Sequence, residues 1–153
     1  MTTPGAPDAS APFTPQARHL AVVSGGSGDP SQTRMLAERM AESASAALSE
    51  HGVVPQIHLI TLRELAVDIA QALVTFAISP ALRAALDEVA QADAVIAVSP
   101  TYKASYSGLF KSFWDLAEPT SVVGVPVLLG ATGGTARHSL MIDTAMRPLF
   151  AYL

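Results

Sequence analysis

The 153-residue chain contains no cysteine. Disulfides, thiolate nucleophiles, cysteine-ligated zinc and iron–sulfur clusters are therefore excluded. Charge is also scarce, because charged residues make up 14% of the chain and the formal net charge is −4. No basic segment is interleaved with aromatic residues. Since nucleic-acid binding requires clustered Lys and Arg to neutralise phosphates, we expect no nucleic-acid partner.

Long hydrophobic runs are absent as well, although half of the residues are hydrophobic. No apolar run reaches the roughly 18 residues that a membrane span requires, so we expect no membrane partner. The longest run, residues 122–132, is interrupted by Gly124 and Pro126 and has the length of one buried strand. High apolar content with a low net charge excludes intrinsic disorder for most of the chain.

The first residues differ in composition from the rest. Residues 1–17 are rich in Pro, Ala, Ser and Thr and contain no apolar segment of the kind found in signal peptides. We therefore expect a disordered leader and a cytoplasmic location. Residues 18–153 show no internal repeat and no second composition regime, which predicts a single domain.

Strand-like and helix-like segments alternate from His19 to the end of the chain. Short apolar runs predict strands over 19–26, 56–62, 92–100 and 123–132. Helical spacing predicts helices within 27–52, over 63–76, 80–92 and 107–118, and from 138 to the end. Such alternation indicates a parallel sheet with helices on both faces, the doubly wound α/β class.

Three loops follow strands of this predicted sheet and hold its unusual polar and glycine residues. They span residues 24–33, 100–106 and 132–135. Ligands of doubly wound proteins bind beyond the carboxyl ends of the strands, where strand order reverses. We therefore expect the three loops to form one site.

The first loop, which runs from Ser24 to Arg34, offers hydroxyls, free backbone N–H groups and the start of a helix. These are the components of an anion site. The loop matches neither the Walker A motif nor G-x-G-x-x-G, which disfavours a nucleoside triphosphate and a Rossmann-bound NAD. Asp29 would oppose a phosphate unless its side chain points outward. The alternative interpretation is an ordinary turn capped by Ser or Thr.

The second and third loops suit a flat ligand. Tyr102 and Lys103 place an aromatic ring and a cation just past the central strand, where a heteroaromatic group could lie against the backbone. Gly133 and Gly134 allow close approach of the backbone, because glycine has no Cβ. The alternatives are a surface turn with one packed tyrosine and an ordinary glycine turn.

Other candidate residues carry less signal. The four histidines are scattered without metal-ligand spacing, so we predict no metal site and expect solvated or capping roles for His19, His51, His58 and His138. Trp114 lies at packing intervals on a predicted helix and is expected in a core or an interface. No G-x-S-x-G elbow supports acyl transfer.

At the three loops the sequence resembles the flavodoxin-like NAD(P)H-dependent FMN reductases, and among them the reductase components of flavin-dependent monooxygenase systems such as the alkanesulfonate and luciferase-like ones. The segments that carry the resemblance are SPTYKASYSGLFKSFWDL (99–116) and GVPVLLGATGGTARHSLMIDTAMRPLFAYL (124–153). It covers about residues 19–153. The fold implied is a flavodoxin-like parallel sheet with strand order 2-1-3-4(-5).

The resemblance implies two cofactors, FMN and either NADPH or NADH. It implies a flavin-dependent monooxygenase as a partner. It also implies a homo-oligomer, either a dimer or a tetramer. It also implies that hydride passes directly from nicotinamide to flavin, so that no side chain is a catalytic acid or base; the protein orients the rings. The positions that match the family's phosphate loop are Ser24, Ser31, Gln32 and Thr33. Those that match the segment along the isoalloxazine ring and the ribityl chain are Pro100, Thr101, Tyr102 and Lys103. Those that match the glycine turn beside the ring are Thr132, Gly133 and Gly134.

The sequence departs from the family pattern in three places. Many relatives have an arginine early in the phosphate loop, whereas here Arg34 is the nearest cation. Thr144 stands where some relatives have an aromatic residue or histidine. No fifth strand is predicted, so we expect a C-terminally truncated family member with residues 123–132 as a bare apolar edge.

Two other functions on this fold stay open from the sequence. One is a quinone or azo-dye reductase that keeps FMN bound. The other is a flavodoxin-type electron carrier, which usually holds the ring between two aromatics and has a strongly acidic face. Only Tyr102 is placed for stacking and a net charge of −4 is mild, so the sequence favours the reductase.

Overall fold

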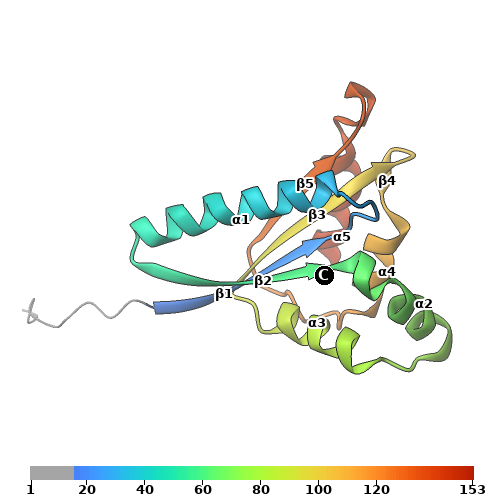
Figure 1. Ribbon diagram of the computed structural model, residues 1–153, viewed down its shortest axis with the longest axis horizontal. Coiled ribbons are helices and arrows are strands. Elements are labelled where there is room, and N and C mark those ends of the chain that lie inside the picture. Colours follow the sequence, from blue (N-terminus) through green and yellow to red (C-terminus); the bar gives the residue numbers. More distant parts are fainter. Residues whose placement is uncertain (1–15) are drawn as a thin grey trace, which may run out of the picture.

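A parallel sheet forms the centre of the computed structural model, which describes residues 16–153 (Figure 1). The predicted leader lies outside the described residues, except for Gln16 and Ala17, which belong to the first strand. The parallel strands follow the order β2-β1-β3-β5, and their bounds are Gln16–Ser24 (β1), Val53–Thr61 (β2), Ala94–Tyr102 (β3) and Val127–Thr132 (β5). The predicted doubly wound, flavodoxin-like fold is confirmed, and the predicted fourth strand is β5.

Helices cover both faces of the sheet. On one face lies the long helix α1, and on the other lie α2, α3, α4 and the C-terminal helices (Figure 1). The α-helices are α1 (Gln32–Glu50), α2 (Ala66–Thr75), α3 (Pro80–Ala90), α4 (Gly108–Leu116) and α5 (Arg147–Tyr152). Leu62–Leu65 (η1) and Ala136–His138 (η2) are 3-10 turns, and Ile142–Met146 (η3) is a π-helix.

The strands are apolar on both sides because each side meets a helix layer. In β1, Leu20 and Val22 pack with the α1 layer, whereas Ala21 and Val23 pack with the larger core under α2, α3 and α4. Trp114 is fully buried in that larger core, where its ring meets Phe150 at 4.8 Å between centroids. Trp114 is therefore a core residue.

Local chemistry explains most helix boundaries. The Ser31 side chain caps α1 by accepting a hydrogen bond from the Arg34 N–H at 3.2 Å. After the helix, Gly52 adopts a φ of 75°, a left-handed conformation that glycine accepts without strain. Ser79 and Ser107 cap α3 and α4 in the same way as Ser31 caps α1.

Several boundaries differ from those predicted. Strand β2 begins at Val53 rather than at residue 56, because Pro55 lies in an edge strand that pairs with β1 alone, where a missing N–H is tolerated. Strand β5 begins at Val127 rather than at 123, since residues 119–124 form turns in which Gly124 has a φ of 75°. The bounds of the other predicted strands and those of α2, α3 and α4 lie within about three residues of the observed ones, and α1 lies inside the predicted range 27–52.

The helix predicted from residue 138 to the end begins at Met141 and runs to Tyr152, but not as one regular α-helix. The segment is divided into η2, η3 and α5. Pro148, near the start of α5, has no N–H to donate to the preceding turn, so the backbone widens there instead of continuing as a regular helix. Thr144 lies inside this widened segment, where its hydroxyl donates to the Leu140 carbonyl at 2.9 Å.

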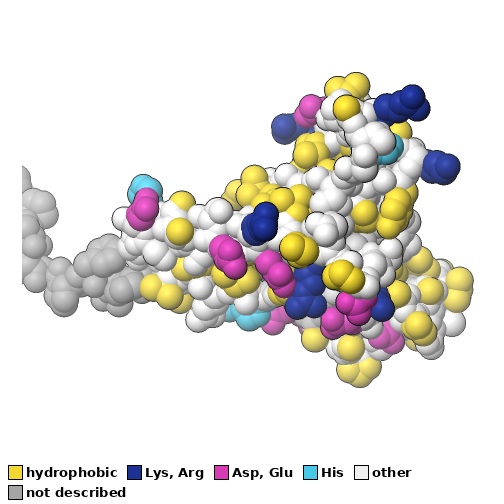
Figure 2. Space-filling model, turned by 45° about the horizontal axis from the view of Figure 1, so that its top comes forward, with side chains coloured by type: hydrophobic (Ala, Val, Ile, Leu, Met, Phe, Trp, Pro, Cys, Tyr) yellow, Lys and Arg dark blue, Asp and Glu magenta, His cyan; other side chains and the backbone are white. Residues whose placement is uncertain are grey.

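No single helix in residues 16–153 is long and apolar enough to cross a bilayer. One pair of helical segments, Leu62–Thr75 and Pro80–Ala90, reaches the required length and hydropathy only when the two are counted together, and they are bent by 92° relative to each other. Acidic and basic side chains lie next to one another on the face shown in Figure 2, without an extended patch of either charge.

Candidate functional site

The carboxyl ends of β1, β3 and β5 bring the three loops together. Because these strands are parallel neighbours, Ser24 lies opposite Val98 and Pro100 lies opposite Thr132. The backbone N–H of Gly25 donates to the Val98 carbonyl at 2.8 Å, which joins the first loop to the central strand. The sequence-based expectation that the loops converge is met by the geometry.

Side-chain hydrogen bonds join the loops to one another. The hydroxyls of Thr33 and Thr132 lie 2.8 Å apart, which links the start of α1 to the end of β5. The Ser27 hydroxyl lies 3.1 Å from the Tyr102 hydroxyl, which links the first loop to the second. In both pairs either oxygen can donate. These two bonds hold the three loops at a common edge of the sheet.

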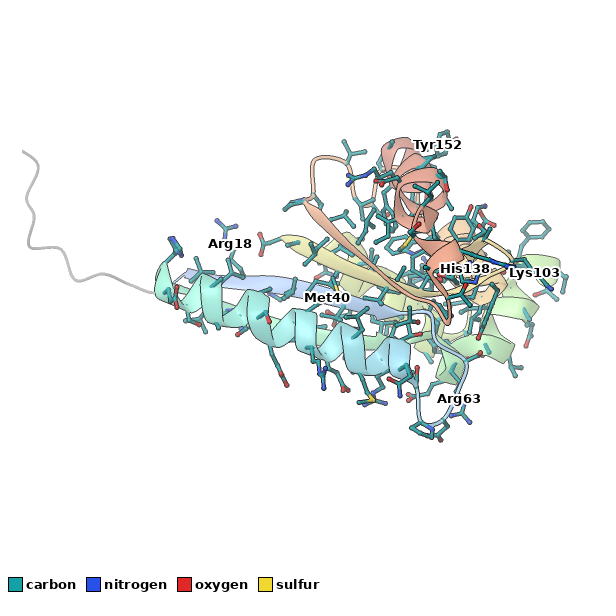
Figure 3. The ribbon with its side chains drawn as sticks, turned by 90° about the horizontal axis from the view of Figure 1, so that it is seen from above. Arg18, Met40, Arg63, Lys103, His138 and Tyr152 are labelled. Carbon is teal, nitrogen blue, oxygen red and sulfur yellow. The ribbon has the colours of Figure 1, made fainter. Side chains whose placement is uncertain are left out.

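A cleft of about 300 Å³ opens between the loops. Every residue that lines it was predicted as a site residue, namely Gln32, Pro100, Thr101, Tyr102, Thr132, Gly133 and Gly134. In Figure 3, Lys103 and His138 lie at this end of the sheet, whereas Arg18 lies at the other end. None of the residues that line the cleft carries a charge, and Tyr102 is its one aromatic ring.

A second hollow, of about 420 Å³, lies on the other side of the start of α1. Ser31 is its one residue from the predicted set, and the others come from the first loop, from α1 and from the end of β2: Gly26, Gly28, Asp29, Arg34, Thr61, Arg63 and Glu64. The last segment, residues 61–64, was missed from the sequence. It follows the carboxyl end of a parallel strand, so the rule that selected the other loops also applies to it.

Charges around the second hollow are paired. Asp29 forms a 2.9 Å ion pair with Arg63, and its side chain is 76% exposed, so its charge faces solvent and is compensated. Arg34 pairs with Glu38 at 2.8 Å and with Glu64 at 3.9 Å. The hydrogen bond that the Arg34 guanidinium donates to the Glu38 carboxylate, together with the negative charge of Glu38, raises the pKa of Arg34. Arg34, which was expected from the sequence to be the cation nearest to the phosphate loop, is thus paired with two carboxylates.

Three predicted site residues line neither hollow. Ser24 is fully buried, and its hydroxyl has no hydrogen-bond partner among the described residues. Thr33 is also buried, and its hydroxyl is engaged with Thr132. Lys103 lies in an exposed turn after β3. Ser24 and Thr33 therefore stand behind the surface of the site rather than on it.

The second loop is a tight hairpin that the sequence did not predict. The two-residue strand β4 (Ser105–Tyr106) pairs antiparallel with Thr101 and Tyr102. The two residues at its tip, Lys103 and Ala104, have φ values of 52° and 66°. Two-residue hairpins require positive φ at both positions, which Asn-Gly usually supplies. Lys and Ala accept this conformation only at a cost, and such strain concentrates at functional loops.

The start of α1 fits a phosphate group. The backbone N–H groups of Gln32 and Thr33 lie in the first turn and have no acceptor within the helix. The partial positive charge of a helix N-terminus favours an anion there. The loop can close on this turn because of Gly26, where a Cβ atom would lie 2.3 Å from the Ser31 Oγ. The orphaned Ser24 hydroxyl below the loop is a further polar group without a partner among the described residues.

The third loop fits a flat ring. A Cβ atom on Gly134 would meet nothing within 4 Å, so the backbone there is open to the cleft. A Cβ on Gly133 would lie 3.2 Å from the Cβ of His138. His138 was not predicted as a site residue, and its Nδ1 is buried without a hydrogen-bond partner in residues 16–153. It supports the glycine turn from behind.

Known proteins are similar to this chain in sequence and fold. Residues 19–153 match the model of the family described as NADPH-dependent FMN reductase. The chain is 42% identical over 133 residues to the NADH-dependent FMN reductase SfnF of Pseudomonas putida, an alignment that covers 87% of this chain and 69% of that protein. It is 36% identical over 133 residues to an FMN reductase (NADPH) of Pseudomonas aeruginosa, with the same two coverages.

A solved structure shows the same arrangement. An oxidoreductase from Corynebacterium diphtheriae superposes with a TM-score of 0.87 at 38% identity, over 90% of this chain and 75% of that one. The family match extends over nearly all of the described residues, and it includes all three loops. The chain therefore belongs to the NADPH-dependent FMN reductase family.

Proposed function

We propose that this chain transfers a hydride from NADPH or NADH to FMN and releases the reduced flavin to a separate monooxygenase. The observation that carries the proposal is the cleft at the carboxyl edge of the sheet, because all its lining residues match positions that the family resemblance assigns to flavin. Family membership supplies the reaction class, and the geometry of the loops is consistent with it.

The start of α1 holds the phosphate in this proposal. Ser31 presents its hydroxyl at the N-cap, and Gln32 and Thr33 present backbone N–H donors in the first turn, at the positive end of the helix dipole. Asp29 does not oppose an anion strongly, because Arg63 compensates its charge. Glu64 does oppose it, since it pairs with Arg34 and adds a negative charge to the neighbouring hollow.

The second and third loops orient the ring. Pro100, Thr101 and Tyr102 form one wall of the cleft, and Thr132 to Gly134 form the other. When bound, FMN supplies the ring that accepts the hydride from nicotinamide. The cleft contributes no charged side chain to this step. Hydride transfer between stacked rings requires orientation and exclusion of water rather than an acid or base, so an uncharged cleft suits it.

Release of the reduced flavin is supported by the sparse aromatic lining. Tyr102, which is 52% exposed, is the one aromatic residue of the cleft, so the ring is not held between two aromatic side chains. A flavin held on one side exchanges more readily than one held on both. This favours flavin as a substrate over the flavodoxin-type carrier and over a reductase with permanently bound FMN.

We also infer that the chain acts as a homo-oligomer in the cytoplasm. Strand β5 pairs with β3 alone in the described part of the chain, and Leu128 on β5 is 51% exposed. Unpaired apolar edges favour association with another chain. Reduced nicotinamide is a cytoplasmic reductant, which supports that location. Light scattering after size exclusion tests the assembly, and a monomer at micromolar concentration would contradict it.

FMN affinity tests the site. In a fluorescence-quenching titration, Gly133→Val is expected to weaken FMN binding at least tenfold, because the added side chain intrudes at the glycine turn. Gly108→Val is the matched control, since a Cβ on Gly108 meets nothing within 4 Å and this residue lines neither hollow. Circular dichroism checks that both variants fold. Equal FMN affinity for folded Gly133→Val and wild type would contradict the assignment.

The choice of acceptor separates the reductase from its rivals. A flavin reductase is expected to reduce added FMN faster than a quinone or an azo dye and to be purified without a flavin spectrum. Flavin retained through gel filtration, together with faster reduction of a quinone, would favour the bound-FMN alternative. Flavin retained without any nicotinamide oxidation would favour the electron carrier.

A further inference from the structure

Two histidines and a glutamate meet on the sheet away from the flavin cleft. We propose that His19, His58 and Glu88 bind a divalent transition-metal ion of the zinc type. One ligand atom from each residue lies within 4.8 Å of one from each of the others. The three residues come from β1, β2 and α3, so the site would join three elements.

Strand register explains how the histidines meet. His19 on β1 lies opposite Gln56 on β2, and His58 follows two residues later. Because side chains alternate along a strand, His58 and Gln56 share a face, and His19 lies on the same side. That side is the one on which Ala21 and Ile60 pack under α3. Solvated or capping roles were expected for the histidines because their spacing along the chain is not that of metal ligands, but the pairing of β1 with β2 brings His19 and His58 together.

The side chains are already arranged as a cluster. The rings of His19 and His58 stack with centroids 5.5 Å apart and planes within 6° of parallel. The Nδ1 atom of His58 lies 3.0 Å from a carboxylate oxygen of Glu88. The Nε2 atom of His58 is buried and has no hydrogen-bond partner among the described residues. His58 therefore has one nitrogen beside an acceptor and one without a partner.

The distances suit metal binding after a small adjustment. Zinc–nitrogen bonds of about 2.0–2.1 Å place tetrahedral ligand atoms roughly 3.3 Å apart. The His58–Glu88 pair already has nearly this separation. Closing the other pairs from at most 4.8 Å to this separation needs a movement of about 1.5 Å. One imidazole must also turn, because the nitrogen lone pairs of two parallel rings lie in parallel planes. The side chains of His58 and Glu88 are 35% and 41% exposed, so they can rotate.

The donor set identifies the class of ion. Two imidazoles and one carboxylate suit Zn²⁺, Co²⁺, Ni²⁺ and Cu²⁺ rather than Ca²⁺ or Mg²⁺, which prefer oxygen ligands. Three protein ligands leave the fourth position for water. Nearby Asp93 is engaged elsewhere, because it accepts hydrogen bonds from the His19 backbone N–H at 2.8 Å and from Arg18 at 2.7 Å. Asp93 thus holds the backbone of His19 in place.

A metal at this position would act on stability rather than on hydride transfer. His19 lies five residues before Ser24 along β1, which is roughly 16 Å from the loop end of the strand. An ion bound by all three side chains would fasten α3 to the edge of the sheet formed by β2. Ligands that bind only the native state raise its stability by mass action.

Calorimetric titration of the tag-free, metal-stripped chain with ZnCl₂ tests the proposal. We expect one equivalent to bind, with affinity reduced at least tenfold in Glu88→Gln and more in His58→Ala. His51→Ala is the matched control, since His51 does not belong to the cluster and its Nδ1 lies 2.9 Å from the Ala47 carbonyl at the end of α1. Its affinity should equal that of the wild type.

A second readout keeps the test independent of folding defects. Binding of Co²⁺ is expected to give visible absorption of a tetrahedral centre in wild type and His51→Ala, and a weaker or absent band in Glu88→Gln. Glu88 is partly exposed, so its amide variant should fold, and circular dichroism verifies this. Stoichiometric binding that is unchanged in folded Glu88→Gln and His58→Ala, or no binding by wild type at millimolar Zn²⁺, would overturn the proposal.

Discussion

The hydrogen bond between Thr33 and Thr132 joins two of the loops that form the proposed flavin cleft, and its removal gives a sharp prediction. Thr33 is 3% exposed, and the two hydroxyls lie 2.8 Å apart. Thr132→Val removes one hydroxyl while conserving shape, which leaves the buried hydroxyl of Thr33 without its partner. Such an unsatisfied group costs about 1–3 kcal/mol.

The double variant distinguishes this bond from simple loss of side-chain packing. Replacing both partners by apolar groups of the same shape is nearly neutral. We therefore expect each single valine variant to lower the free energy of unfolding by about 1–2 kcal/mol and the double variant to lose less than the sum, with a coupling energy of about 1 kcal/mol. For a domain of this size each kilocalorie corresponds to about 2–4 °C in Tm.

Urea unfolding at 25 °C, followed by circular dichroism, measures the cycle. Shifts of the midpoint at constant slope would show that stability changed and not the compactness of either state. Ser27→Ala is the matched control, because its bond to Tyr102 is exposed and its loss should cost little. Strictly additive losses in the Thr33 and Thr132 variants, within about 0.3 kcal/mol, would refute the reasoning.

Three further predictions follow from other parts of the site and the sheet. Ala104→Gly is expected to raise the free energy of unfolding by about 0.5–1 kcal/mol, because glycine accepts the φ of 66° without a Cβ clash; urea unfolding checks this, and a loss would contradict it. Glu64→Gln is expected to tighten FMN binding several-fold at low salt, because it removes a negative charge that competes for Arg34. This gain in affinity should disappear at 1 M NaCl, where charges are screened, and a gain that is unchanged by salt would contradict the prediction. Two hydrogen bonds lower the pKa of Asp93, the larger contribution coming from the backbone N–H of His19 and the smaller from the Arg18 side chain. The stability that Asp93 contributes is therefore present above its unfolded pKa of about 3.9 and is lost as the pH falls through the lower pKa of the folded state. Asp93→Asn should therefore destabilise the protein at pH 7 and have little effect near pH 2, and equal losses at both pH values in urea unfolding would contradict this.

Most of the fold could be predicted because its signals are local. Continuous apolar runs between glycine and proline residues predicted the parallel strands, and alternation with helices predicted their class. Capping residues such as Ser31 and Ser107 lie where the helices begin. The predicted strand begins at residue 56, after the observed start of β2 at Val53. Proline usually interrupts a strand, and only the whole fold shows that Pro55 lies in an edge strand, where proline is tolerated.

Two local structures could not be read from the sequence. The hairpin of β3 and β4 carries Lys103 and Ala104 at positions that favour Asn-Gly, so no turn signal was present. Tertiary contacts such as the Ser27–Tyr102 bond support it. One regular helix was predicted from residue 138 to the end, but residues 142–146, which precede Pro148, form a π-helix.

The cleft was predicted through the resemblance and the rule about strand ends, whereas residues brought there by other means were missed. Arg63 and Glu64 follow the end of β2, and their ion pairs with the first loop depend on three-dimensional placement. His138 lies behind Gly133, a contact that spacing does not reveal. The stacking of His19 on His58 likewise arises from strand register, which a search for local ligand spacing does not include.

Flavin-dependent oxidation of reduced nicotinamide tests the central claim most directly. The purified chain is mixed under air with NADPH or with NADH, and the initial rate is followed at increasing FMN concentration. We predict a negligible rate without FMN and a rate that rises and saturates with it, with half-saturation shifted to higher FMN in Gly133→Val. No FMN-dependent oxidation of either nicotinamide, by protein that still quenches FMN fluorescence, would contradict the proposed function.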